Sequence, residues 1–178
     1  MSNERQSDKE FSKKIGTRMT LIAWIIVLGM LTFAFSGYLA RQSNPNQTIQ
    51  SLNYQDKTEI ILRQNRSGHY VATAEINLVP VDVIVDTGAT DVSIPESLAN
   101  RLGLVKGSNI TATTANGIIT VYSTRIDFIK LGDINMYDVR ASINPNMSEN
   151  VVLLGMSFLD KLEFSHSNNQ LVLKQVKN

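Results

Sequence analysis

The sequence of 178 residues contains no cysteine. This absence excludes disulfide bonds, thiolate nucleophiles and zinc sites with cysteine ligands. Histidine is scarce as well, because His69 and His166 are the two histidines of the sequence and lack the close spacing of paired metal ligands. We therefore expect no metal site built on histidine or cysteine ligands.

An excess of charge of one sign is also lacking, since 17 basic residues are opposed by 16 acidic residues. Residues 41–178 carry twelve Lys/Arg against thirteen Asp/Glu, which gives this part a net charge of −1. Nucleic-acid binding requires a strongly basic face, so the composition excludes nucleic acid as a partner. The hydrophobic content of 43% is typical of a chain with a globular core.

One long run, residues 19–40, has no charged residue. At 1.5 Å per residue it can cross a hydrocarbon core of about 30 Å. Trp24 and Tyr38 lie towards its two ends, where aromatic residues of membrane proteins collect. The run therefore predicts a single transmembrane helix. The alternative is a cleaved signal peptide with Ala34, Phe35 and Ser36 at the cleavage site, but the run is longer than the usual apolar region of such peptides.

The charges that flank this run predict its orientation. Lys13, Lys14 and Arg18 precede it, and only Arg41 follows closely, so the N-terminus is expected in the cytoplasm. The chain is then a single-pass protein of the inner (cytoplasmic) membrane, with a periplasmic or otherwise extracytoplasmic C-terminal domain. Residues 1–18 are expected to form a cytoplasmic tail, with residues 1–12 solvated and partly disordered, and the polar residues 41–57 a linker.

Residues 58–178 have the pattern of an all-β domain with one or two short helices. The turn-rich residues 65–68 predict a hairpin between the first two strands, and Pro95 and Gly103 bound a brief predicted helix over 95–104. Such a domain is expected to be a barrel or a sandwich. Strands are expected in the following segments: 58–64, 69–78, 81–86, 92–95, 108–132, 134–143, 151–154 and 170–176.

The stretch VIVDTGAT (83–90) delivers one carboxylate, Asp86, from an apolar strand into a glycine turn. Gly88 permits a tight turn and a close approach of substrate, and Thr87 offers a hydroxyl to a neighbouring loop. A single carboxylate cannot act as acid and base at once, whereas two facing carboxylates share one proton and can divide these roles. Because the chain has one such turn, the second copy must come from another chain in a two-fold symmetric dimer. The other aspartates, including Asp82 and Asp91, are interpreted as solvated or turn carboxylates.

The segment VDTGATDVSIP resembles the active-site turn of retropepsin-like aspartic proteases. TTANG (113–117) is similar to the tip of the substrate-covering flap of that family. VVLLGMSFL (151–159) is similar to the segment that supports its catalytic loop. The resemblance covers roughly residues 66–176. Together with the N-terminal apolar run, these motifs most resemble the bacterial membrane-anchored members.

This resemblance implies a small closed β-barrel, active as a homodimer, that hydrolyses peptide bonds of a protein or peptide substrate without metal or cofactor. Asp86 is implied as the catalytic carboxylate. The remaining implied site residues support the catalytic turn (Thr87, Gly88, Ala89), form the flap that binds substrate (Ala115, Asn116, Gly117) and support the catalytic loop (Leu154, Gly155).

Two other functions are compatible with parts of this pattern. A non-catalytic, membrane-tethered dimerisation or peptide-binding module could use the same barrel, but its mark would be a damaged Asp-Thr-Gly turn, and here the turn is intact. Phosphoryl transfer through an aspartyl phosphate requires magnesium-binding acids and a lysine beside the nucleophile. The DTGAT turn contains neither.

Overall fold

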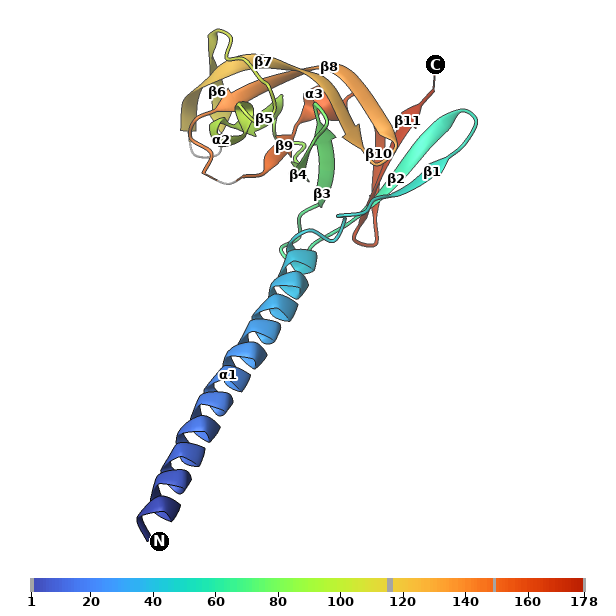
Figure 1. Ribbon diagram of the computed structural model, residues 1–178. Helices are drawn as coiled ribbons and strands as arrows, with labels where there is room; N and C mark the ends of the chain where they lie inside the picture. The colour runs from blue at the N-terminus through green and yellow to red at the C-terminus, as the bar shows by residue number, and fades with distance from the viewer. Residues whose placement is uncertain (1, 115–116, 149, 178) are drawn as a thin grey trace. The chain divides into compact units, whose positions relative to one another are not determined.

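The computed structural model describes residues 2–114, 117–148 and 150–177, with side chains from Arg18 onward. The chain divides into two compact units, residues 1–40 and residues 41–178. Helix α1 (Ser2–Ser43) makes up the first unit and reaches the beginning of the second. The second unit holds all of the described strands (Figure 1).

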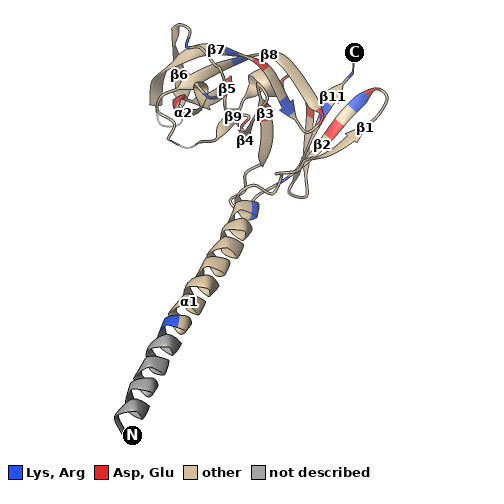
Figure 2. Ribbon diagram, in the orientation of Figure 1, with Lys and Arg blue, Asp and Glu red and all other residues tan. Residues whose placement is uncertain are grey.

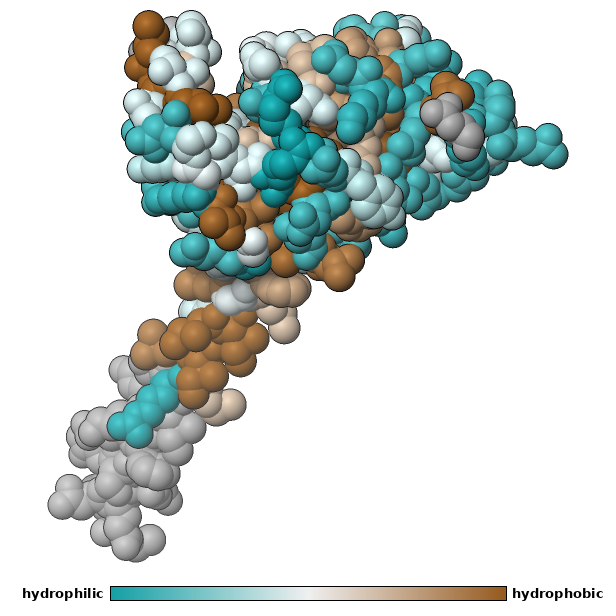
Figure 3. Space-filling model, turned by 90° about the horizontal axis from the view of Figure 1, so that it is seen from above, coloured by the Kyte–Doolittle hydropathy of each residue, from teal (hydrophilic) through white to brown (hydrophobic). Residues whose placement is uncertain are grey.

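Helix α1 contains the uncharged run that was expected to cross a membrane. It has no charged side chain between Arg18 and Arg41 (Figure 2), and its apolar side chains are exposed (Figure 3). The segment Arg18–Ser43 is long and apolar enough to span a bilayer, as signal sequences also are. Because α1 begins at Ser2, the prediction of a partly disordered segment over residues 1–12 is wrong for the described backbone, which is helical.

A seven-stranded sheet forms most of the second unit, in the order β3-β4-β9-β5-β8-β7-β6. β3 also pairs with β7, through Glu75 with Lys130 and Ile76 with Ile129, so the sheet curls back on itself (Figure 1). The pairings β4–β9 and β5–β8 are parallel. The strands are β3 (Val71–Ile76), β4 (Val79–Val85), β5 (Val92–Pro95), β6 (Asn109–Thr114), β7 (Gly117–Leu131), β8 (Ile134–Asn144) and β9 (Val152–Leu154).

A four-stranded antiparallel sheet, in the order β1-β2-β11-β10, completes the unit. Its members are β1 (Gln50–Asn53), β2 (Lys57–Arg63), β10 (Glu163–Ser167) and β11 (Gln170–Val176). Buried residues alternate along β2 (Thr58, Ile60, Leu62) and along the first half of β11 (Leu171, Leu173), as the two-residue period of a half-covered sheet requires. Two single-turn helices, α2 (Glu96–Ala99) and α3 (Met156–Leu159), lie between strands along the chain.

One hydrophobic core joins the two sheets. Aliphatic side chains of β-branched and leucine residues dominate it, which fits strands covered on one face or on both. This core surrounds β4 and β9 and so fixes the strand end from which Asp86 emerges. The largest fully buried side chains are Phe158, Ile60, Leu62, Ile76, Ile94, Leu102, Ile126, Ile129, Leu131, Ile134, Ile143 and Leu154.

The prediction that the strands on either side of residues 65–68 form a hairpin is wrong, because β2 and β3 do not pair with each other. The backbone does turn there, with the Gly68 N–H donating to the Asn65 oxygen at 3.1 Å. However, β2 pairs with β1 and β11, and β3 pairs with β4 and β7. The β3–β4 hairpin closes instead through Asn77 and Leu78, whose φ angles of 48° and 66° match a two-residue turn with two positive φ values.

The predicted helix over 95–104 is shorter than expected. Only Glu96–Ala99 is helical, and the chain then turns to Gly103, whose φ of 69° ends the element as the sequence had indicated. The N-cap residue, Pro95, makes no capping hydrogen bond.

The expected linker over residues 41–57 is also wrong as an unstructured tether. These residues belong to the second compact unit, and strand β1 lies within them, paired with β2 from Gln50 to Asn53. Asn44 and Asn46 are buried. Residues 41–57 are therefore part of the folded domain, although their composition is polar.

Candidate active site

Asp86 stands at the carboxyl end of β4. The parallel pairing of Val85 with Leu154 continues one residue further, because the Asp86 N–H donates to the Leu154 oxygen at 3.1 Å. The Val85 N–H donates to the Tyr70 oxygen at 3.0 Å on the other side of the strand. Asp86 is half-buried. The side chain thus leaves a strand that is held from both sides, directly before the glycine turn.

The turn after Asp86 is closed by bonds to Asp86 itself. The Gly88 N–H donates to Oδ1 of Asp86 at 2.9 Å, and the Ala89 N–H donates to the main-chain oxygen of Asp86 at 3.3 Å. Thr87 and Gly88 are exposed, and Ala89 is half-buried. The bond from the Gly88 N–H fixes the orientation of the Asp86 carboxylate.

Gly155 and helix α3 hold this turn from behind. The Met156 N–H donates to the Ala89 oxygen at 2.8 Å, and the Ser157 N–H donates to the Thr90 oxygen at 2.9 Å. Gly155 is buried between them, against the backbone of Ala89 and Asp91. The structure therefore brings Leu154 and Gly155 into direct contact with the turn.

A second brace lies beyond the turn, and sequence reasoning missed it. Nε of Arg140 donates to Oδ1 of Asp91 at 2.6 Å, so the interpretation of Asp91 as a solvated carboxylate is wrong. Oγ of Ser157 donates to the Arg140 oxygen at 2.7 Å and accepts the N–H of Val92 at 3.0 Å. No local sequence signal reveals these contacts, because they join residues 17, 49 and 65 positions apart.

A pocket of about 270 Å³ lies beside Asp86 and Thr87. Among the described residues that line it, the others are mainly apolar or aromatic, and Asp86 is the one carboxylate. The Tyr70 hydroxyl is buried and has no hydrogen-bond partner among the described residues, and burial raises the pKa of Tyr70. The remaining lining residues include Leu159, Phe164, His166, Leu171 and Leu173.

The predicted flap falls on the β6–β7 hairpin, which joins Thr114 to Gly117. Oγ1 of Thr114 donates to the Gly117 oxygen at 2.9 Å, and Gly117 has a φ of 115°. Ala115 and Asn116 lie outside the described residues. Among the described residues no hydrogen bond links Gly117 to the Asp86 turn.

The residues that the structure describes contain no group of three or more His, Cys, Asp or Glu side chains that could hold a metal ion.

Comparison with known proteins agrees with this geometry. The model of a family described as "gag-polyprotein putative aspartyl protease" matches residues 72–161, which include the Asp86 turn, the β6–β7 hairpin and the Leu154–Gly155 segment. An uncharacterized protein from the cobV 5′ region of a Sinorhizobium species is 26% identical over 159 residues, covering 83% of this chain and 68% of the relative. An uncharacterized protein of Rickettsia prowazekii is 23% identical, covering 87% of this chain and 68% of that relative.

The fold is shared with a retropepsin-like protein of known structure. The crystal structure of a retropepsin-like aspartic protease from Rickettsia conorii matches with a TM-score of 0.56 and 23% identity, covering 72% of this chain and 95% of that chain. At this level of identity the match shows the fold alone.

Proposed function

This chain belongs to the gag-polyprotein aspartyl protease family, with the retropepsin-like fold expected from its sequence, and on that premise we propose that it is an aspartic endopeptidase. It acts as a homodimer in which each chain supplies one Asp86. The observation that carries the proposal is the position of Asp86, at the end of a braced strand and beside an apolar pocket that contains no other carboxylate.

The proposed dimer is needed because one carboxylate cannot act as the acid and the base of peptide hydrolysis at the same time. Two Asp86 side chains that face each other across a two-fold axis cannot both ionise at a separation of a few ångströms, so they share one proton. The apolar wall beside Asp86 supports this proposal, because Phe164 is 46% exposed there and would be covered by a second chain.

Hydrolysis then divides between the two carboxyl groups. The ionised Asp86 removes a proton from a water molecule, whose oxygen attacks the carbonyl carbon of the peptide bond. The protonated Asp86 of the other chain donates to the carbonyl oxygen as the tetrahedral intermediate forms. Transfer of a proton to the amide nitrogen allows the C–N bond to break, which releases an amine and a carboxylic acid and restores the shared proton.

The other candidate residues receive supporting roles in this proposal. Thr87, Gly88 and Ala89 shape the turn, and Leu154 and Gly155 hold it from behind through the contacts of β9 and α3. The β6–β7 hairpin, with Ala115, Asn116 and Gly117 at its tip, is the segment proposed to cover an extended peptide.

The proposed location is a membrane, with residues 19–40 as a single span. The basic residues before this span favour a cytoplasmic N-terminus and an extracytoplasmic catalytic domain. The exposed apolar surface of α1 supports the anchor, because an isolated apolar helix is not stable in water.

The test is an incubation of the purified full-length protein with a random peptide library, read by mass spectrometry. The matched control is Asp86→Asn, which keeps an oxygen to accept the Gly88 N–H but cannot be ionised. We expect new peptide termini with the wild-type protein and a rate at least about 1,000-fold lower with the variant, with an unchanged circular dichroism spectrum. Cleavage by Asp86→Asn at the wild-type rate would refute the assignment.

A further inference from the structure

The first residues after the apolar helix are docked into the β-domain. The Ser43 oxygen at the end of α1 accepts a hydrogen bond from Nδ2 of Asn65 at 3.0 Å. Asn44 and Asn46, which follow, are each 3% exposed. We call residues 43–46 the clamp. Burial of two asparagine side chains is unusual, and it is stable only when their polar atoms are bonded.

The side chain of Asn46 bonds to main-chain groups of two strands, as a neighbouring strand would. Its Nδ2 donates to the Arg63 oxygen at 2.8 Å and to the Val71 oxygen at 2.7 Å, and its Oδ1 accepts the Arg63 N–H at 2.7 Å. Its own main-chain oxygen accepts the N–H of Thr73 at 3.3 Å. One side chain thus joins the end of β2 to the beginning of β3.

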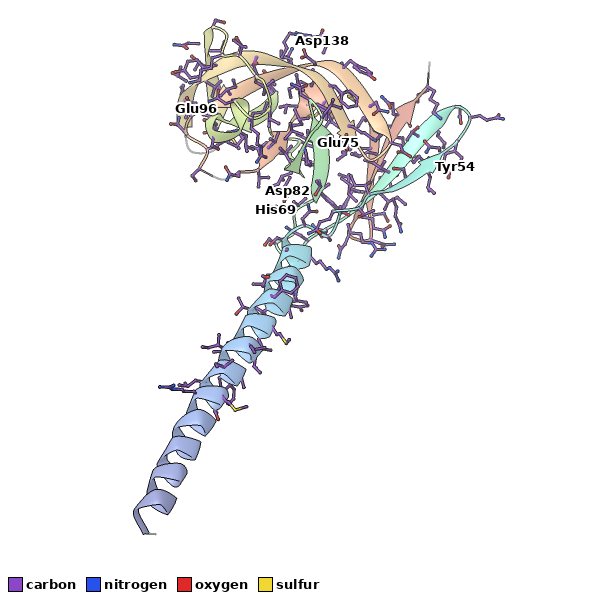
Figure 4. The ribbon with its side chains drawn as sticks, in the orientation of Figure 1. Tyr54, His69, Glu75, Asp82, Glu96 and Asp138 are labelled. Atoms are coloured by element: carbon purple, nitrogen blue, oxygen red, sulfur yellow. The ribbon has the colours of Figure 1, made fainter. Side chains whose placement is uncertain are left out.

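Asn44 extends the clamp to the strand that carries Asp86. Its Nδ2 donates to Oγ1 of Thr73 at 2.9 Å and to Oδ1 of Asp82 at 2.8 Å. Asp82, labelled in Figure 4, lies on β4 four residues before Asp86 and also accepts the Thr73 hydroxyl at 2.9 Å. Asp82 is exposed, as expected for a solvated carboxylate, and is also a partner in this network.

Because the clamp is bonded to the domain, no flexible linker follows the apolar helix. A free linker over residues 41–57 would allow the domain to move up to about 55 Å from the membrane. With the clamp, folded structure begins where α1 ends. A compact unit the size of residues 41–178 has a radius of gyration of about 14 Å, so Asp86 stays within about 40 Å of Asn44, whatever the angle between helix and domain.

From this short reach we propose that the substrates are polypeptides anchored in the same membrane and cleaved in an extended segment within about 50 Å of the bilayer. The inference rests on the proposed peptidase activity and on insertion of residues 19–40. Confinement of enzyme and substrate to one surface raises their effective concentration, provided that the tethers allow the two sites to meet. Polypeptides free in solution, or segments far from the bilayer, gain nothing from the anchor.

The experiment uses the full-length protein in liposomes and one cleavable peptide, taken from the library. The peptide is supplied free in solution, or attached to lipid through polyproline spacers of about 10 or about 40 residues, which extend about 3.1 Å per residue. The matched variant carries a 40-residue Gly/Ser insertion between Ala40 and Arg41, which leaves the clamp intact.

For the native protein we expect the short-spacer substrate to be cleaved at least about 10-fold faster than the long-spacer substrate, and the insertion to reduce this ratio to about 3-fold or less. Equal spacer dependence in the two proteins would overturn the inference while leaving the peptidase intact. If the insertion variant fails to cleave even the free peptide, the test is the native protein's rate on the two spacers. Equal rates on the short and the long spacer would then overturn the inference. If the native protein fails to cleave the free peptide, the proposed function itself fails.

Discussion

Gly155 lies so close to Ala89 that a Cβ atom placed on the glycine would stand 2.6 Å from the Ala89 oxygen. The main-chain oxygen of Asp91 would be closer still. Both obstacles are backbone atoms of the turn that begins at Asp86, so neither can move aside without displacing it. The glycine lets β9 and α3 approach the turn closely enough to bond it.

The first prediction concerns this contact. We expect Gly155→Ala to lower the free energy of unfolding by about 3 kcal/mol, near the upper end of the usual cost of overpacking. We also expect it to reduce peptide turnover at least 10-fold, because Asp86 moves with the turn. Urea unfolding in detergent micelles and turnover of a library-derived peptide measure the two effects.

Gly37→Ala is the matched control, since nothing lies within 4 Å of a Cβ at that position. It should leave both quantities unchanged. A Gly155→Ala protein with wild-type stability and turnover would show that the turn tolerates the displacement and that the proposed support role is wrong.

The second prediction concerns the clamp. Asn46→Ala removes three side-chain hydrogen bonds and leaves the main-chain groups of Arg63 and Val71 without these partners. We expect a loss of about 3 kcal/mol in the free energy of unfolding, since buried unpaired backbone groups are costly. Thr48→Ala, at an exposed position two residues away, should change stability by less than about 0.5 kcal/mol. Equal unfolding midpoints for the two variants would contradict the clamp.

The third prediction tests whether one site needs two chains. Wild-type protein mixed with an equal amount of Asp86→Asn and allowed to exchange should lose about half of its activity per wild-type chain, because half of the wild-type chains then pair with an inactive partner. Specific activity should also fall on dilution. Activity that is unaffected by either treatment would establish a self-sufficient monomer.

The fourth prediction concerns pH and the pairing of the two central strands β2 and β11. The largest cause that lowers the pKa of Glu59 is its hydrogen bond with Lys57. Lys174, which lies opposite Glu59 on β11, lowers this pKa further. A carboxyl whose pKa is lower in the folded state stabilises the fold above the unfolded pKa of about 4.5 and loses that contribution as pH falls through the folded value.

We therefore expect the urea midpoint of the wild-type protein to fall more between pH 7 and pH 3 than that of Glu59→Gln. The exposed Glu75, labelled in Figure 4, provides the control substitution Glu75→Gln. Parallel pH profiles for wild-type and Glu59→Gln would show that the ion pair contributes nothing to folding, as exposed pairs often do not.

The parts of this protein that the sequence predicts well are those with local causes. β-Branched runs mark the strands, Gly103 marks the end of a turn, and the apolar strand that leads into Asp-Thr-Gly marks the candidate site. Each signal depends on residues within about ten positions. These features agree with the structure because the local preference and the global fold point the same way.

The parts that it predicts poorly depend on contacts between distant segments. The turn at residues 65–68 indicated that β2 pairs with β3, but β11, more than 100 residues away, takes that place. No periodic pattern in the sequence predicts the Arg140–Asp91 pair or the Asn44–Asp82 bond. Each of them joins two polar side chains, and a single polar side chain is typical of a solvated surface. Composition likewise described residues 41–57 as a linker, because it cannot show that two asparagines are buried.

The clamp finally determines where this protein could be shed from its anchor without damage. A protease that cut before Ser43 would release a domain whose Asn44 and Asn46 contacts stay complete. A cut just after Asn46 would instead leave both asparagines on the N-terminal fragment, and the strand that leads to Asp86 would lose their support. Release at the first position and inactivation at the second are thus separated by only a few peptide bonds.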